Sequence, residues 1–174
     1  MNEEEKKKKS IVVTFIKDQM VKWRVSDHGV PKEGERIHTR VNNRYITIFR
    51  NKGKLSVIDS ICHHAGGPLT LGPLQEIEDL GVTVVLCPWH KYMVSIEDGR
   101  KIYQAVEVIN SKPVIIGWTQ GRTVQRSHLI TEDSNGIFVE LMENEQIIAS
   151  DADTCNERCA QDYTLHHVTP TPIN

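Results

Sequence analysis

The sequence predicts an all-β fold made of antiparallel strands, and two observations support this prediction. Short runs rich in β-branched and aromatic residues recur from Ile11 onward, and residues that favour tight turns separate several of them. Two mildly helical segments, residues 74–80 and the tail near Cys155, are too short to build a helical layer. The expected strands are residues 11–16, 44–49, 54–59, 82–86, 91–96, 112–118, 123–130 and 137–142.

Three hairpins are expected where Asn or Asp lies one or two residues before a glycine, because these residues tolerate the positive φ of a tight reversal. In the arm after the third turn, Ile137, Val139 and Leu141 recur at every second position. This period is typical of a strand with one buried face. The three turns are Asn51-Lys52-Gly53, Asp98-Gly99 and Asn135-Gly136.

Length and charge limit the classes of function. The chain has 174 residues, of which 39% are hydrophobic, so one domain with its own core is expected. Its 21 Lys and Arg residues are balanced by 23 Asp and Glu residues, which gives no basic field for nucleic acid. The longest apolar runs, such as Val82 to Leu86, are too short to cross a membrane. No secretory or organelle signal is recognisable at the amino terminus, so we expect a cytoplasmic protein.

Three regions are expected along the chain. Residues 1–10 form a charge run that cannot bury apolar surface and is expected to be flexible. Residues 11–143 carry the strand pattern and form the domain. Residues 144–174 form a polar tail. Within the tail, Cys155 and Cys159 have no neighbouring histidine or cysteine to complete a metal site, so we interpret them as passive thiols.

Two short motifs carry the chemistry. Each pairs a cysteine with a histidine: Cys62-x-His64 and Cys87-x-x-His90. In an extended loop, residues two apart project to the same side, so Cys62 and His64 can face one inorganic centre, and Pro88 helps to fix the tighter second loop. Thiolates and neutral imidazoles bind iron or zinc. Zinc ligand pairs are usually separated by at least two residues, which makes zinc the weaker alternative.

The motifs resemble those of the Rieske family, in which two histidines replace two cysteines on one iron of a [2Fe–2S] cluster. The string CHHAGGPL is similar to the first Rieske loop, and CPWH is similar to the second. Over residues 11–143 the chain most resembles the small, ferredoxin-like cytosolic Rieske-domain proteins of animals. The resemblance implies an antiparallel β-sandwich or incomplete barrel that carries a small cluster-binding subdomain, built from two loops at about residues 60–93.

The same resemblance implies the ligands of the cluster. Cys62 and Cys87 would bind one iron, while His64 and His90 would bind the other iron, nearer to solvent. The remaining residues of the two loops would support the cluster. Gly66, Gly67 and Pro68 would let the first loop fold closely over it, Trp89 would shield it from water, and Tyr92 would pack or donate a hydrogen bond.

Departures from respiratory Rieske proteins bear on the reduction potential. Those proteins carry two further cysteines that bridge the loops, and the matching positions here are Gly67 and Trp89, which cannot form a disulfide. Tyr92 stands where they have a hydroxyl residue, and Lys91 replaces a glycine. We expect a low-to-middle potential, although Lys91 adds positive charge nearby. Residues 73–82 look like an insertion, which is either a partner-facing element or an inert loop.

The sequence therefore predicts a single-electron carrier without a catalytic site of its own. Its partner would be a redox protein, either a reductase or an oxygenase-type acceptor. A cluster-dependent redox or iron sensor is one alternative, and an accessory subunit of an oxygenase is another. The chain is too short to add the mononuclear iron domain of a complete Rieske oxygenase.

Overall fold

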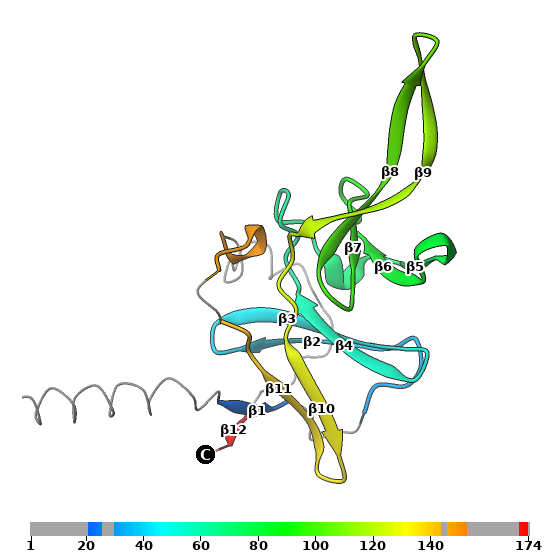
Figure 1. The fold of residues 1–174 in the computed structure, drawn as a ribbon. Helices are drawn as coiled ribbons and strands as arrows, with labels where there is room; N and C mark the ends of the chain where they lie inside the picture. Colours follow the sequence, from blue (N-terminus) through cyan, green and yellow to red (C-terminus); the bar gives the residue numbers. More distant parts are fainter. Residues whose placement is uncertain (1–20, 26–29, 144–145, 153–170, 174) are drawn as a thin grey trace, which may run out of the picture.

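The computed structural model describes residues 21–25, 30–143, 146–152 and 171–173, and it shows three antiparallel sheets (Figure 1). The strand orders are β10-β11-β1-β12, β2-β3-β4 and β5-β6-β7-β8-β9. The all-β, antiparallel fold expected from the sequence is confirmed. The strands are β1 (Lys22–Arg24), β2 (Arg36–Val41), β3 (Arg44–Asn51), β4 (Lys54–Asp59), β5 (Leu74–Ile77), β6 (Val82–Leu86), β7 (Met93–Ser95), β8 (Arg100–Ile109), β9 (Lys112–Thr123), β10 (Leu129–Asp133), β11 (Gly136–Glu140) and β12 (Thr171–Ile173).

The sheet of β2, β3 and β4 separates two hydrophobic cores. Ile46 and Ile48 on β3 point to the first core, which also contains Ile137 and Val139 of β11. Phe49, one residue further along β3, belongs to the second core. This division follows from the period of two in a strand, because successive side chains point to opposite faces.

The second core lies under the two predicted ligand loops. Its buried members include both Cys62 and Cys87. Aliphatic and aromatic side chains from four strands and the adjoining loops surround the two cysteines, so the thiols are built into the packing of the domain. The other buried members are Phe49, Ile58, Leu69, Val85, Val94 and Ile96.

All three predicted hairpin turns are present. Lys52 and Gly53 have φ values of 52° and 73° between β3 and β4, and Gly99 has a φ of 67° between β7 and β8. Gly136 begins the strand that pairs with β10. Two further hairpins were not predicted because their turns contain no glycine. Their turn residues, all with positive φ, are Asn42, Asn43, Asn110 and Ser111.

Two predicted elements were wrong in part. Residues 74–80 form strand β5 and the 3-10 turn η2 (Glu78–Leu80), because pairing with β6 outweighs a weak helical pattern in so short a segment. The expected strand at residues 123–130 covers the end of β9, an irregular segment and the start of β10. The expected strand at 11–16, the flexible segment 1–10 and the tail cysteines lie outside the described residues.

No helix in the described part of the chain has the length and apolar character needed to cross a bilayer.

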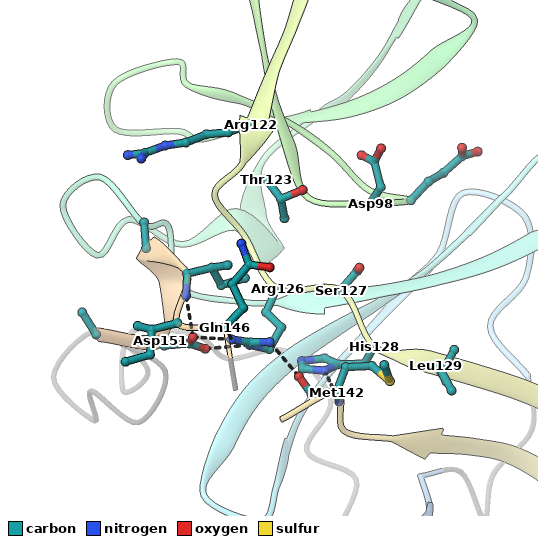
Figure 2. A pocket seen from close by; sticks show the side chains of 15 residues that line it. Asp98, Arg122, Thr123, Arg126, Ser127, His128, Leu129, Met142, Gln146 and Asp151 are labelled. Atoms are coloured by element: carbon teal, nitrogen blue, oxygen red, sulfur yellow. Dashed lines mark hydrogen bonds and ion pairs between the residues drawn. The ribbon is translucent and has the colours of Figure 1, made fainter. Parts of the chain in front are cut away.

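An ionic network holds η3 (Ala149–Ala152) against β3 and β4, and Figure 2 shows its Arg126–Asp151 pair. Arg44 donates to Asp59 at 2.7 Å and to Asp151 at 2.9 Å, and the Arg126 guanidinium pairs with Asp151. The hydroxyl of Ser150 donates to Asp59 at 2.6 Å. The hydrogen bond from Arg126 lowers the pKa of Asp151 far below its usual range, although burial opposes this effect.

Replacing Asp151 with asparagine is expected to destabilise the domain. Because the pKa of Asp151 is lower in the folded state than its ordinary value of 3.8, its stabilisation is complete above about pH 4 and is lost as the pH falls further. We expect Asp151→Asn to lower the free energy of unfolding by about 2 kcal/mol at neutral pH, or the melting temperature by about 6 °C.

Thermal unfolding followed by circular dichroism between about pH 7 and about pH 3 measures this effect. The difference between Asp151→Asn and wild type should shrink towards the acidic end. The exposed Asp98 pairs with the half-exposed Arg100, and such a surface pair contributes little, so Asp98→Asn is the control and should change little. Equal effects of the two substitutions at neutral pH would contradict the role assigned to Asp151.

Candidate metal centre

Two loops above the second core bring the predicted ligands together. The first follows β4, and an isolated bridge between Ile61 and Pro68 closes it. The second joins β6 to β7. Both loops therefore start from strands that are fixed in the sheets, and each carries one cysteine and one of the two histidines, His64 or His90.

The two loops share one backbone conformation. In each, the cysteine N–H donates to the carbonyl five residues later, from Cys62 to Gly67 and from Cys87 to Tyr92, both at 2.8 Å. The N–H four residues after each cysteine donates back to the cysteine carbonyl, at 2.9 Å in both loops. The donors of these return bonds, Gly66 and Lys91, have φ values of 75° and 59°. Each loop therefore turns tightly around its cysteine.

The turns point backbone N–H groups at the sulfur atoms. The N–H groups of His64 and Ala65 donate to Cys62, and those of Trp89 and His90 donate to Cys87. Both thiols are 1% exposed. N–H donors favour the thiolate, which is the form that binds a metal ion.

The two cysteine side chains lie close enough to share a hydrogen bond. This bond lowers the pKa of Cys87 to about 6, against the opposing effect of its burial. The same bond, together with burial, raises the pKa of Cys62 well above its usual range. The pair therefore shares one proton in the absence of metal, and a cation between the sulfur atoms would replace that proton.

The two histidines lie on the outer side of the loops. His64 and His90 are exposed, and their ring centroids are 4.9 Å apart with the planes at 89°. Tyr92 stacks on His64 at 4.3 Å between centroids, which restricts that imidazole. The donors thus form two pairs, with sulfur buried and nitrogen exposed. Among the described residues, no three His, Cys, Asp or Glu side chains surround one ion position.

Gly67 is required by close packing between the loops. A Cβ at this position would lie 2.6 Å from Sγ of Cys87 and 3.2 Å from the ring of Trp89. The indole of Trp89 packs on Gly67 but remains 52% exposed, so it covers only part of the site. Gly67 thus lets the two loops approach each other closely, and the donor set fits a binuclear centre with two thiolate and two imidazole ligands.

Gln125 was not predicted, although it supports the first loop more directly than any residue within that loop. Its side chain is fully buried, and its Nε2 donates to the carbonyls of Asp59 at 2.9 Å and Ile61 at 2.7 Å. Its Oε1 accepts from the N–H of His63 at 3.2 Å. One amide group therefore bonds the backbone on both sides of Cys62. A polar residue within an expected strand was the only available signal.

Gln125 also connects the first loop to the hairpin that follows the second loop. Its backbone N–H and that of Val124 donate to the carbonyl of Gly99, at 3.1 Å and 2.9 Å. The side chain of Gln125 thus holds the Cys62 loop while its backbone holds the turn after β7. This arrangement fixes the separation of the two cysteine loops.

Replacing Gln125 with methionine should loosen the site without creating a cavity. The substitution removes two donors and one acceptor from buried backbone groups, at a cost of about 3 kcal/mol. We expect iron release to a chelator to become at least about tenfold faster, measured by the decay of visible absorbance. Gln75→Met on the exposed face of β5 is the control. Equal release rates in both variants would exclude a supporting role for Gln125.

A cavity of about 1120 Å³ lies beside the Arg126–Asp151 pair (Figure 2). Arg126 in its wall is already bonded to other groups, since it also donates to the carbonyls of Met142 and Gln146. Volume alone would select this cavity as the functional site. The chemistry of the side chains selects the cysteine and histidine loops instead, because two thiols and two imidazoles lie close together there.

Comparisons with known proteins show the family of the chain. A family model described as soluble Rieske-type ferredoxin matches residues 24–144. The human protein "Rieske domain-containing protein" is 35% identical over 112 residues, which cover 63% of this chain and 68% of the human protein.

Among solved structures, the ferredoxin of carbazole 1,9a-dioxygenase from Nocardioides aromaticivorans IC177 matches with a TM-score of 0.45 at 20% identity. That match covers 68% of this chain and 95% of the ferredoxin. A putative NADH-dependent nitrite reductase small subunit from Mycobacterium tuberculosis matches with a TM-score of 0.48 at 16% identity, over 70% of this chain and 96% of that subunit. By the family model and the human relative, the chain belongs to the soluble Rieske-type ferredoxin family.

Proposed function

We propose that this protein is a single-electron carrier that holds a [2Fe–2S] cluster, with Cys62 and Cys87 on one iron and His64 and His90 on the other. The observation that carries the proposal is the division of the donors into a buried sulfur pair and an exposed imidazole pair on two matching loops. When bound, the cluster supplies a one-electron couple.

The buried half of the site would stabilise the electron on the protein. Backbone N–H groups from four residues point at the two sulfur atoms, and they favour added negative charge there. Because the loops are tied to the second core and to Gln125, the ligands would move little between oxidation states. A rigid ligand set of this kind suits repeated electron transfer.

The exposed half of the site would be the route for the electron. His64 and His90 lie at the surface, so a partner protein can approach the imidazole edges without any opening of the fold. The partner we propose is a redox protein, either a reductase or an oxygenase-type acceptor. The cytoplasmic location expected from the sequence belongs to the same proposal.

We also propose a potential in the low-to-middle part of the Rieske range, which spans roughly −150 to +300 mV. Gly67 and Trp89 face each other across the two loops, and neither can form the bridging disulfide of respiratory Rieske proteins. Tyr92 stacks its ring on His64. Lys91 is exposed, so water screens its charge, which weakens its effect on the potential.

Stoichiometric electron exchange tests the carrier function. The anaerobically reduced protein should transfer one electron per chain to ferricyanide. After repeated cycles of reduction and oxidation, the visible spectrum of the oxidised protein should be the same as before the first cycle. If the protein loses its cluster after one cycle, and its self-association or its affinity for a partner protein changes with that loss, it would be a sensor instead. A colourless protein that contains zinc would have a structural metal site.

A further inference from the structure

The hairpin of β8 and β9 extends away from the rest of the domain (Figure 1). β8 pairs with β7 only at Lys101 and Ile102, so beyond Tyr103 the two strands pair only with each other. The turn at Asn110 and Ser111 has positive φ at both residues, which is the geometry of a tight two-residue hairpin.

The extended part of this hairpin exposes many large aliphatic side chains. Six of them are between 41% and 75% exposed. Soluble proteins rarely leave so many apolar side chains together in water unless the surface is an interaction site. A two-stranded ribbon is also only marginally stable by itself, so a bound partner would stabilise it. The six residues are Val106, Val108, Ile109, Val114, Ile115 and Ile116.

Part of this apolar surface forms a continuous face, which we call the hairpin stripe: Val106, Val108, Pro113 and Ile115. Val106 lies opposite Ile115, and Val108 lies opposite Pro113. Residues that are opposite each other, or two apart along a strand, share one face of a ribbon. The stripe therefore presents branched side chains side by side over two residue pairs.

The hairpin stripe continues into a groove at the metal centre. Gln104 and Trp118 form the next cross-strand pair towards the domain on this face, beyond a bulge, and both line a groove of about 270 Å³. His90, Tyr92 and Met93 line the same groove. A protein that covers the stripe would therefore also contact His90, whose exposed imidazole is the proposed electron route.

The hairpin that carries the stripe has an excess of positive charge, although Lys101 and Lys112 lie on its opposite face. Residues 100–123 contain four basic side chains and one acidic side chain, Glu107. Arg100 pairs with Asp98, whereas Lys101, Lys112 and Arg122 form no ion pair with another residue in the part of the chain that the structure describes. Lys91 adds a further exposed cation beside the groove.

We propose that the hairpin stripe and the adjoining groove are the docking surface for the electron-exchange partner, a protein whose contact surface is apolar at the centre and acidic at the rim. This proposal rests on the proposed carrier function. The excess of cations argues against a second copy of this chain, because two copies facing each other would bring like charges together. The amino-terminal segment has four lysines at residues 6–9 beside three glutamates at residues 3–5, so it offers no net acidic surface to the hairpin.

The test compares electron-exchange rates with two oxidants. Cytochrome b5, an acidic haem protein, is the protein probe, and ferricyanide is the small-molecule probe that needs no docking surface. The stripe variant combines Val106→Thr, Val108→Thr and Ile115→Thr, which keep β-branched residues at exposed positions. The charge variant combines Lys112→Glu and Arg122→Glu. The control variant, Leu129→Thr, changes an exposed apolar residue on β10.

We expect the second-order rate constant with cytochrome b5 to fall about tenfold in the stripe variant and in the charge variant, and to fall with rising salt. In the stripe variant the ferricyanide rate should match that of wild type, and the Leu129→Thr control should match wild type with both oxidants. In the charge variant the ferricyanide rate should fall less than the cytochrome b5 rate, because ferricyanide is also an anion but needs no docking surface. Unchanged cytochrome b5 rates in both variants, with normal ferricyanide rates, would overturn the docking surface but leave the carrier function intact. If wild type sediments as a dimer and the stripe variant as a monomer, the stripe binds a second copy of this chain, and the proposed docking of a redox partner is overturned. No exchange with ferricyanide would instead reject the carrier function.

Discussion

Replacement of Cys87 by serine is expected to abolish cluster incorporation. The thiol is buried between backbone N–H donors and Cys62, and a serine hydroxyl would not ionise there to bind iron. Iron and sulfide bound to the purified protein should fall to less than about a tenth of the wild-type content, and the visible absorbance should disappear. Cys62→Ser should have the same effect, because both sulfur atoms would bind the same iron in the proposed site.

The control for this experiment uses the other two cysteines of the chain. Cys155 and Cys159 are interpreted as passive thiols, so the double variant Cys155→Ser, Cys159→Ser should keep its full content of iron and sulfide. Retention of a cluster by Cys87→Ser, or loss of it from the double variant, would mean that the ligands have been assigned incorrectly.

Replacement of Gly99 by alanine is expected to be the most destabilising single change in the fold. Gly99 has a φ of 67°, and a Cβ there would lie 1.7 Å from the carbonyl oxygen of Gln125. Neither backbone can move freely, because the carbonyl of Gly99 accepts from Val124 and Gln125. We expect a loss of more than about 4 kcal/mol, which would leave little folded protein. Soluble yield and thermal unfolding measure this loss.

Gly81 provides a matched control for the steric effect. Its φ of 64° is close to that of Gly99, but no atom lies within 4 Å of the position that a Cβ would occupy. Gly81→Ala should therefore cost only the backbone strain of a left-handed conformation, about 1 kcal/mol. Similar melting temperatures for the two variants would show that the contact between Gly99 and Gln125 is not required.

The strands that the sequence predicted correctly are those whose pattern is local. Residues 44–49 and 54–59 carry β-branched runs around a turn with glycine, and they form most of β3 and β4. The hairpins at Asn42–Asn43 and Asn110–Ser111 were missed because asparagine and serine adopt positive φ less predictably than glycine. The helical pattern at residues 74–80 failed because pairing with β6 is a tertiary effect.

The donors of the proposed metal centre could be named from the sequence, but the residue that supports their loops could not. Cys62 and Cys87 lie within short motifs, so their spacing alone indicated an inorganic centre. Gln125 is 63 residues after Cys62 in the chain, and no local pattern connects them. The same reason hides the network of Asp59 and Asp151, whose partners come from distant segments. Positioning groups of this kind depend on tertiary structure, and a single sequence contains no direct signal for them.

The exposure of the hairpin stripe could not be predicted from the sequence either. Residues 112–118 were expected to form a strand, and they do so within β9. A run of apolar residues in a strand is ordinarily interpreted as buried, yet Val114, Ile115 and Ile116 are exposed. Only the arrangement of the sheet, in which β8 leaves β7 after two residue pairs, reveals that among the described strands this part of β9 pairs with β8 alone.

Pulsed electron paramagnetic resonance of the anaerobically purified, dithionite-reduced protein, with iron, sulfide and zinc assayed on the same sample, tests the central claim most directly. We expect two iron and two sulfide per chain and couplings from two imidazole nitrogens, because one iron would be bound by His64 and His90. A sample that holds zinc without sulfide, or a cluster signal without nitrogen coupling, would contradict the mixed sulfur and nitrogen site.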